Sequence, residues 1–461
     1  MKEGNPRFSI IGLGKLGCSM AAAIAKRGFQ VVGVDLVPDV VEKLNQGIAP
    51  VQETALQETI EAVMDRLRAT LDTTDAILNT DLSFVIVPTP SDTRGAFSLQ
   101  YAAWACREIG HALADKGEYH TVVLTSTVLP GSTRYGLLPV LEGASGKTCG
   151  VDFGLCYSPE FIALGSVIRD FLNPDFTLVG EYDEKSGSTL EDCYALITEN
   201  KPPCKRMTIE NAELTKIALN TFVTTKITYA NMLAELCEKI PGGDVDIVTD
   251  AIGTDSRIGS KYLKGSLGYG GPCFPRDNAA LSFLAQAVGV DAGLAETTDR
   301  INRTRVETIL QRLEPYLKPG STVAVLGLAY KPFSHSVEES QGIQMASMLA
   351  ARGFRVIGCD PRARTGAREV FRDKVMVLDD VSSSLAQADV VIITTPDPLF
   401  MTLRGKDFPR KDPPVVVMDC WRILRTELAE SDHVTYLPLG IAEDECATAE
   451  AMADLWGKGV V

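Results

Sequence analysis

The chain of 461 residues is acidic, with 60 Asp and Glu residues against 45 Lys and Arg residues and a formal net charge of −15. At about 150 residues per domain, this length predicts about three domains. Its 45% hydrophobic and 23% charged residues are ordinary values for a globular protein and exclude a disordered or collagen-like chain. The negative charge opposes binding to nucleic acid or to an anionic membrane surface, since both need a basic face.

The lengths of the apolar runs and the spacing of the cysteines indicate in which cellular compartment the protein is expected. No apolar run reaches the roughly 18 residues that a membrane-spanning helix needs. Residues 1–6 lack the apolar core of a signal peptide. The 11 cysteines include no pair at Cys-x-x-Cys spacing, and the four histidines are scattered. We therefore expect reduced thiols, no metal site, no membrane attachment and a cytoplasmic location.

The first predicted feature is a dinucleotide-binding unit. An apolar strand from Phe8 meets a Gly-x-Gly-x-x-Gly turn, an alanine-rich helix follows over 19–26, and a second strand over 30–34 ends at Asp35. Such a turn lets a pyrophosphate approach backbone N–H groups at a helix N-terminus. Asp35 would accept hydrogen bonds from a ribose 2′-hydroxyl and repel a 2′-phosphate, which favours NAD over NADP. The candidate cofactor-binding residues here are Gly12, Leu13, Gly14, Lys15, Leu16, Gly17 and Asp35.

A second half of the chain repeats this pattern. Residues 25–35 closely parallel residues 350–360, and both halves alternate strands with helices, which predicts parallel sheets. The second turn keeps Gly327 but lacks the other two glycines, so it can hardly hold a dinucleotide in the same way. Lys331 at that turn suits a different phosphate-bearing ligand. We predict an α/β protein with two Rossmann-like, doubly wound parallel-sheet domains joined by a long central helix.

That central helix is predicted over residues 211–240, which contain no Gly or Pro and carry apolar residues at helical spacing. It would be about 45 Å long, enough to bridge two domains and to offer a face to a second copy. Lys216 and Asn220 lie four residues apart and therefore share one face of the helix.

Cys273 is the candidate nucleophile. It follows paired glycines and precedes Pro275, a good first-turn residue for a helix predicted over 277–288. A thiol near a helix N-terminus with basic neighbours ionises readily and can attack a carbonyl. The other ten cysteines we interpret as small buried residues.

Together these residues resemble the UDP-glucose/GDP-mannose dehydrogenase family, from Phe8 to about Leu424. Each motif alone is modest, but the set in this order is specific. Besides the first glycine turn, the matching motifs are Val-Pro-Thr-Pro at 87–90, Ser-Thr-Val-Leu-Pro-Gly at 126–131, Ser-Pro-Glu-Phe at 158–161, the helix segment 212–220, Gly-Gly-x-Cys-Phe-Pro-x-Asp at 270–277 and Gly-Leu-Ala-Tyr-Lys-Pro at 327–332.

The resemblance implies a four-electron oxidation of a primary alcohol to a carboxylate with two NAD in succession. Cys273 would trap the intermediate aldehyde as a thiohemiacetal, and the second oxidation would leave a thioester for water to hydrolyse. Glu160 would activate that water, and Asp277 would accept a proton through a water shared with Thr127. The implied catalytic residues are Cys273, Lys216, Asn220, Asp277, Glu160 and Thr127, with Lys216 and Asn220 stabilising oxyanions.

The same resemblance implies the binding residues and the domains. Arg257 matches an arginine that reaches the sugar of a neighbouring subunit, which implies a homodimer through the central helix. The expected domains are an NAD-binding domain (1–210), a central helical domain with the cysteine loop (211–300) and a nucleotide-sugar-binding domain (301–461). Thr89 and Thr127 join the cofactor residues. The implied substrate-binding residues are Glu160, Phe161, Leu164, Lys216, Asn220, Arg257, Tyr262, Leu263, Lys264, Tyr269, Gly270 and Lys331.

Several positions depart from the family pattern. Leu164 stands where a second glutamate is usual, Phe176 where many members have an arginine, and Glu338 where an arginine is expected. Near the C-terminus Trp421 interrupts an Asp-Gly-Arg pattern, so that the arginine comes one place later. An exchange of arginine for glutamate at a phosphate-facing site reverses the local field. The pattern at 273–277 favours UDP-glucose, while UDP-N-acetylhexosamines, UDP-galactose and GDP-mannose stay open as substrates.

Two other readings compete with this one. A two-electron β-hydroxyacid or 6-phosphogluconate-type dehydrogenase shares the first Rossmann domain and a helical centre, but it needs neither Cys273 nor Lys331. A sugar-nucleotide-binding sensor on a degenerate scaffold would explain the lost arginines, but it would not need to keep the catalytic set together.

Overall fold

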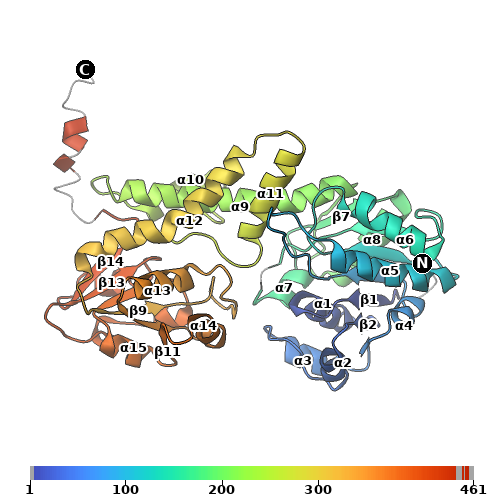
Figure 1. The fold of residues 1–461 in the computed structure, drawn as a ribbon, viewed down its shortest axis with the longest axis horizontal. Helices are drawn as coiled ribbons and strands as arrows, with labels where there is room; N and C mark the ends of the chain where they lie inside the picture. The colour runs from blue at the N-terminus through green and yellow to red at the C-terminus, as the bar shows by residue number, and fades with distance from the viewer. Residues whose placement is uncertain (1–4, 163, 443–448, 451, 456–461) are drawn as a thin grey trace. The chain divides into compact units, whose positions relative to one another are not determined.

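The computed structural model describes residues 5–162, 164–442, 449–450 and 452–455. The chain forms two compact units, Met1–Leu219 and Asn220–Val461, and the boundary between them falls inside helix α9 (Ile209–Cys237). This helix is continuous over 29 residues (Figure 1), close to the predicted 211–240. In the described part of the chain, no helix combines the length and the apolar character that crossing a bilayer requires.

The first unit is built on an eight-stranded sheet with the order β3-β2-β1-β4-β5-β6-β7-β8. Its strands are β1 (Phe8–Ile11), β2 (Val31–Val34), β3 (Leu67–Thr70), β4 (Leu82–Val85), β5 (Thr121–Leu124), β6 (Gly154–Tyr157), β7 (Thr177–Glu181) and β8 (Cys204–Thr208). Its helices are α1 (Lys15–Lys26), α2 (Pro38–Asn45), α3 (Leu56–Glu61), α4 (Thr73–Leu78), α5 (Gln100–Asp115), α6 (Leu138–Ser145), α7 (Val167–Leu172) and α8 (Glu184–Ile197).

Alternating apolar residues give this sheet two buried faces. In β1, Phe8 and Ile10 belong to one apolar cluster and Ile11 to a second one, because successive side chains of a strand point to opposite faces. The strand order reverses between β1 and β4, which is where Rossmann folds bind their ligands. The fold therefore confirms the Rossmann-like prediction for this half.

One strand pair departs from the parallel pattern. β7 runs antiparallel to β6, whereas the other neighbouring pairs of the sheet are parallel. The chain therefore leaves β6 and enters β7 at the same edge of the sheet. This topology brings Glu160, just after β6, and Phe176, just before β7, to one edge.

The second unit contains the rest of α9, a helical segment and a second sheet. The six strands have the order β11-β10-β9-β12-β13-β14, and the paired neighbours are parallel. They are β9 (Thr322–Leu326), β10 (Arg355–Cys359), β11 (Met376–Leu378), β12 (Val390–Ile393), β13 (Val415–Asp419) and β14 (Val434–Pro438). The helices are α10 (Val245–Thr254), α11 (Phe274–Ala287), α12 (Gly293–Leu313), α13 (Gln341–Ala351), α14 (Arg364–Phe371), α15 (Val381–Gln387), α16 (Pro398–Met401) and α17 (Arg425–Leu428).

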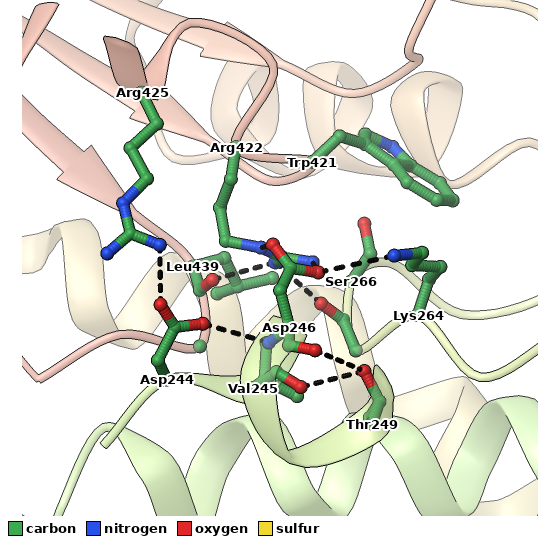
Figure 2. A network of polar contacts seen from close by, with 12 residues as sticks. Asp244, Val245, Asp246, Thr249, Lys264, Ser266, Trp421, Arg422, Arg425 and Leu439 are labelled. Carbon is green, nitrogen blue, oxygen red and sulfur yellow. Dashed lines mark hydrogen bonds and ion pairs between the residues drawn. The ribbon is translucent and has the colours of Figure 1, made fainter. Parts of the chain in front are cut away.

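A buried arginine ties the helical segment of this unit to its sheet. Figure 2 shows Arg422, just after β13, reaching Asp246 at the start of α10 with two hydrogen bonds of 2.7 and 3.0 Å. The same guanidinium donates to the carbonyls of Gly265 (2.7 Å) and Leu439 (2.8 Å), and its side chain is only 2% exposed. The ammonium of Lys264 lies 3.7 Å from the Asp246 carboxylate. The loop that carries Lys264 is therefore fixed between α10 and the end of β13.

We predict that Arg422→Met destabilises the folded chain by about 3 kcal/mol, because Asp246 loses its two hydrogen bonds from the guanidinium and two carbonyls lose a buried donor. The matched control is Arg303→Met, which removes the pair between the exposed Arg303 and Asp299 within α12 and is expected to cost less than about 0.5 kcal/mol. Urea unfolding followed by circular dichroism measures both changes. Equal effects of the two variants would contradict the structural role of Arg422.

Candidate active site

The glycine turn after β1 has the shape that a dinucleotide needs. A Cβ atom on Gly17 would lie 1.9 Å from the carbonyl oxygen of Gly12, so only glycine lets α1 approach the turn this closely. A Cβ atom on Gly14 would meet nothing within 4 Å, and no side chain of the described residues caps the N-terminus of α1. The first N–H groups of α1 are thus left for an anionic ligand such as a pyrophosphate.

Asp35 also fits a dinucleotide. One carboxylate oxygen accepts the N–H of Leu13 at 2.8 Å, and the other accepts the N–H of Val37 at 3.0 Å. A carboxylate has about four acceptor positions, so Asp35 keeps capacity for ribose hydroxyls while it holds the glycine turn in place.

The predicted cofactor residue Thr89 lies in the loop that follows β4. Its hydroxyl donates to the carbonyl of Thr127 at 2.7 Å. The hydroxyl of Ser126 donates to the carbonyl of Val87 (2.6 Å) and accepts the N–H of Val87 (2.9 Å). The loops after β4 and β5 are therefore joined, and Thr89 and Thr127 come together at the edge of the sheet that carries the glycine turn.

A buried lysine and a half-buried glutamate form the first candidate catalytic group. The Lys216 ammonium donates to the backbone carbonyl of Glu160 at 2.7 Å and lies 4.7 Å from the centre of the Phe161 ring. Burial raises the pKa of Glu160 to about 7, although the charge of Lys216 and a hydrogen bond from Tyr194 oppose this rise. A carboxyl group with such a pKa can gain and lose a proton near neutral pH, which a general base requires.

Phe176, one of the departures from the family pattern, packs in the same region. Its ring centre lies 4.9 Å from that of Phe161, whose ring is also near Lys216. The antiparallel entry into β7 places the two phenylalanines at one edge of the sheet. An aromatic contact thus occupies the position of the expected arginine, and Leu164 nearby in the chain is half-buried.

The second unit holds the second candidate group. The side-chain amide of Asn220, in α9, donates to the Asp277 carboxylate at 2.6 Å, and Asp277 is fully buried. The guanidinium of Arg276 lies 3.8 Å from the other carboxylate oxygen. Helix α11 begins at Phe274 rather than at the predicted residue 277, because Pro275 fits its first turn.

Cys273 is the N-cap residue of α11, and it is exposed. The N–H of Asp277 bonds to the carbonyl of Cys273 at 2.9 Å, so the thiol and the carboxylate are one helical turn apart. Of the ten cysteines in the described residues, eight are buried and Cys204 is half-buried, while Cys446 lies outside the described residues. Burial raises the pKa of Cys106 and Cys420 to about 12, which makes these thiols poor nucleophiles.

The loop before Cys273 runs against the turn that follows β9. The N–H of Gly271 donates to the carbonyl of Glu338 at 3.0 Å, and a Cβ atom on Gly271 would lie 2.6 Å from the Tyr330 ring. Only glycine at position 271 allows the loop to approach Tyr330 this closely. The hydrogen bond to Glu338 involves only the main chain of that residue, so it does not depend on whether arginine or glutamate stands there.

The remaining predicted substrate residues of the second unit differ in exposure. Leu263 and Tyr269 are buried, and the backbone of Tyr269 exchanges two hydrogen bonds with the side chain of Asn302. Tyr262 is 51% exposed, and the side chain of Arg257 is 86% exposed and paired with Asp255 at 2.6 Å. The others in this unit are Lys264, which is exposed, Gly270, which is buried, and Lys331, which is half-buried with its ammonium 5.7 Å from the centre of the Tyr330 ring.

Two supporting residues were missed by the sequence analysis. Glu213 is fully buried in α9 and accepts the N–H groups of Gly131 (2.5 Å) and Thr133 (2.8 Å), so it holds the loop that begins at Ser126. Burial raises the pKa of Glu213 to about 7. Its position three residues before Lys216 places it near the same face of the helix and could have indicated a role. Its partners, however, lie about 80 residues away in the chain, so no local sequence pattern connects them with Glu213.

The other missed residue is Gly342. A Cβ atom there would lie 2.2 Å from the carbonyl oxygen of Gly327, which repeats the relation between Gly17 and Gly12. The second half therefore keeps the close contact between its first strand and the following helix. The contact could not be predicted from the sequence, because a loop over 327–340 separates β9 from α13 and places Gly342 outside the Gly-x-Gly-x-x-Gly spacing.

The glycine turn, the acid after β2 and the buried polar groups define a dinucleotide-dependent oxidoreductase. Family models match the NAD-binding domain (6–198), the central domain (210–304) and the UDP-binding domain (324–426) of the UDP-glucose/GDP-mannose dehydrogenases. The chain belongs to this family of nucleotide-sugar dehydrogenases, and its cofactor is NAD.

Individual relatives cover nearly the whole chain. It is 40% identical to UDP-glucose 6-dehydrogenase AglM of Haloferax volcanii over 84% of this chain and 90% of that protein. It is 36% identical to a GDP-mannose 6-dehydrogenase of Azotobacter vinelandii over 87% and 94% of the two chains. The solved structure of a UDP-glucose dehydrogenase from Pyrobaculum islandicum matches with a TM-score of 0.85 and 32% identity, covering 96% of this chain and 99% of that one.

We predict that Asp35→Ala weakens NAD binding by about 10- to 100-fold, because the ribose loses a charged acceptor and Leu13 loses its partner. Binding of NADP should weaken less, since the repulsion of a 2′-phosphate is also removed. Titration calorimetry with both dinucleotides measures the ratio. Asp39→Ala, an acidic residue in α2 paired with Lys43, is the matched control and should bind NAD like the unmodified chain. Unchanged NAD affinity in Asp35→Ala would contradict the assignment.

Proposed function

We propose that this chain oxidises the C6 primary alcohol of a nucleotide sugar to a carboxylate, with two NAD reduced per sugar and Cys273 as the covalent nucleophile. The observation that carries the proposal is the exposed Cys273 at the start of α11, one turn before a buried Asp277 that is bound to Asn220. NAD, when bound, accepts a hydride at each of the two oxidations.

In the first oxidation the alcohol loses a proton and a hydride and becomes an aldehyde. Asp277 accepts the proton, directly or through a water held with Thr127, and this requires a carboxylate that is fixed in position. The hydrogen bond from Asn220 at 2.6 Å provides that fixation. The ammonium of Lys216 stabilises the alkoxide as the proton leaves.

In the second oxidation the thiolate of Cys273 forms a C–S bond to the aldehyde carbon and gives a thiohemiacetal. Loss of a hydride from that carbon and of the hydroxyl proton leaves a thioester. Water then adds to the thioester carbonyl, Glu160 accepts a proton from this water, and the C–S bond breaks to release the carboxylate and the thiol. Lys216 and Asn220 stabilise the oxyanions of these steps.

We propose UDP-glucose as the sugar nucleotide. The sequence Cys-Phe-Pro-x-Asp at 273–277 and the 40% identity to UDP-glucose 6-dehydrogenase AglM support this choice. The domain division at 1–210, 211–300 and 301–461 is part of the same proposal, with Lys331 contacting the nucleotide. A cytoplasmic location would keep the Cys273 thiol reduced.

We predict two NADH per molecule of UDP-glucose consumed, and at least a roughly 10³-fold loss of turnover in Cys273→Ala. NADH absorbance and product analysis over UDP-glucose, UDP-galactose, UDP-N-acetylhexosamines and GDP-mannose measure both quantities. Cys204→Ala, which removes a half-buried thiol, is the matched control and should retain turnover.

The alternatives have distinct results in this experiment. One NADH per sugar would indicate a two-electron dehydrogenase and exclude the thioester. Complete inactivity over the panel, with sugar nucleotides still binding, would favour a sensor. Faster turnover with GDP-mannose than with UDP-glucose would keep the reaction and overturn the choice of sugar.

We further propose that the chain is a homodimer formed through α9. Three large apolar side chains on this helix, Phe222, Tyr229 and Leu236, are 65%, 49% and 50% exposed and seven residues apart. Residues at this spacing form one stripe along a helix, and exposed apolar stripes of this kind mark protein interfaces. A second copy would cover the stripe with its own, as in symmetric dimers. In the dimer, the exposed Arg257 would exchange its ion pair with Asp255 for a contact with the partner's sugar.

We predict that the double variant Tyr229→Asp with Leu236→Asp is a monomer, because it buries four carboxylates in the paired stripe. Light scattering after size-exclusion chromatography measures the mass. Leu294→Asp changes a leucine in α12 that is 71% exposed, more than Leu236, and this variant should stay dimeric. A monomeric unmodified chain, or a dimeric double variant, would contradict an interface on α9.

A further inference from the structure

A chain of two hydroxyl groups leads to the candidate base Glu160. The Tyr194 hydroxyl, from α8, lies 3.4 Å from a carboxylate oxygen of Glu160 and 2.7 Å from the hydroxyl of Ser158. The Ser158 hydroxyl in turn donates to the backbone carbonyl of Leu178 in β7 at 2.7 Å. Ser158 and Tyr194 are 1% and 5% exposed, so bulk water has little access to either group.

The protons of this chain can be counted. Ser158 donates its only hydroxyl proton to the carbonyl of Leu178, so its oxygen acts as an acceptor toward Tyr194. Tyr194 also has one proton but two acceptors, Ser158 and Glu160. Because the Ser158 proton is used on Leu178, the shorter contact of 2.7 Å makes Ser158 a stronger acceptor for the Tyr194 proton than Glu160 at 3.4 Å. The longer contact, in which Tyr194 donates to Glu160, is therefore the weaker of the two.

We propose that Tyr194 is a positioning residue for Glu160, and that Ser158 competes with the Glu160 carboxylate for the hydroxyl proton of Tyr194. This inference rests on the proposed role of Glu160 in thioester hydrolysis. It assigns a task to the serine of the Ser-Pro-Glu-Phe motif and to a tyrosine that no motif of the sequence singled out.

The competition gives Glu160 a partner in both of its protonation states. As a carboxylate, Glu160 attracts the Tyr194 proton away from Ser158. As a carboxylic acid, it donates its own proton to the Tyr194 oxygen, while the Tyr194 proton returns to Ser158. A buried group that changes charge would otherwise leave an unsatisfied donor or acceptor in one of its states, which is costly. The chain of hydroxyls removes that cost in each catalytic cycle.

Two other titratable groups act on this arrangement in the described part of the first unit. Lys216, from α9, favours the charged form of Glu160, and Cys204, in β8, acts on Tyr194. Burial opposes ionisation of both Glu160 and Tyr194, so Tyr194 keeps its proton throughout.

The test compares variants that act on the Tyr194 proton in opposite ways. Tyr194→Phe removes the donor, so the Glu160 carboxylate is less stable and the acidic limb of the pH profile of kcat moves to higher pH. Ser158→Ala removes the competing acceptor, so Tyr194 donates fully to Glu160 and the limb moves to lower pH. Each shift should be about 0.5 to 1 pH unit, the size expected for one hydrogen bond. The double variant should behave like Tyr194→Phe alone.

Two controls complete the design. Tyr182→Phe removes another tyrosine hydroxyl of the first unit and should leave the profile in place, and KM for the sugar nucleotide should stay within about twofold in the variants. Glu160→Gln, measured in parallel, should accumulate the Cys273 thioester, which intact-protein mass spectrometry detects as an added sugar nucleotide.

The outcomes separate the inference from the function on which it rests. Opposite shifts support the inference. Coincident profiles, or shifts of the same sign, combined with thioester accumulation in Glu160→Gln overturn the inference and leave the general base intact. Full turnover in Glu160→Gln overturns the general base and the inference together. If Tyr194→Phe does not fold, Ser158→Ala decides the question by the sign of its own shift.

Discussion

The spacing of side chains along α9 is the constraint on which both candidate catalytic groups depend. Glu213, Lys216 and Asn220 are three and four residues apart, so the helical repeat places them along one face. Each is buried and holds a different partner within its own unit: a loop N–H, the carbonyl of Glu160 or the carboxylate of Asp277. Each unit thus takes its candidate catalytic group from residues of its own part of α9.

Burial then sets the chemistry of the groups that α9 holds. The net charge of −15 belongs to the chain as a whole, whereas Lys216, Asn220 and Asp277 are buried. Burial brings the pKa of Glu160 close to neutral pH, while exposure leaves Cys273 accessible to a substrate. Among the described cysteines, buried thiols with raised pKa values thus contrast with the exposed thiol of Cys273 at the start of a helix, and the difference comes from position.

The two Rossmann-like halves show how one pattern serves two purposes. Asp35 accepts one N–H on each oxygen and keeps acceptor capacity. Its counterpart Asp360 is buried and accepts the N–H groups of Leu328 and Ala329 on one oxygen and those of Arg362 and Ala363 on the other. Asp360 is therefore saturated by backbone donors and stabilises its turn. Trp421, one of the departures from the family pattern, also bonds to the backbone: its indole N–H donates to the carbonyl of Thr394 at 2.9 Å.

The sequence by itself determined the fold class, the cofactor, the long central helix and the family, because each depends on local spacing: glycines in a turn, an acid after a strand, apolar residues at helical intervals. Only the tertiary structure decided which residues support the site. Glu213 holds a loop about 80 residues away, Gly342 restores a contact that an intervening loop had displaced, and Phe176 meets Phe161 because β7 runs against β6. Tyr194 reaches Glu160 and Ser158 from another helix. These relations depend on strand direction and close packing between distant segments, and such contacts leave no periodic mark in the chain.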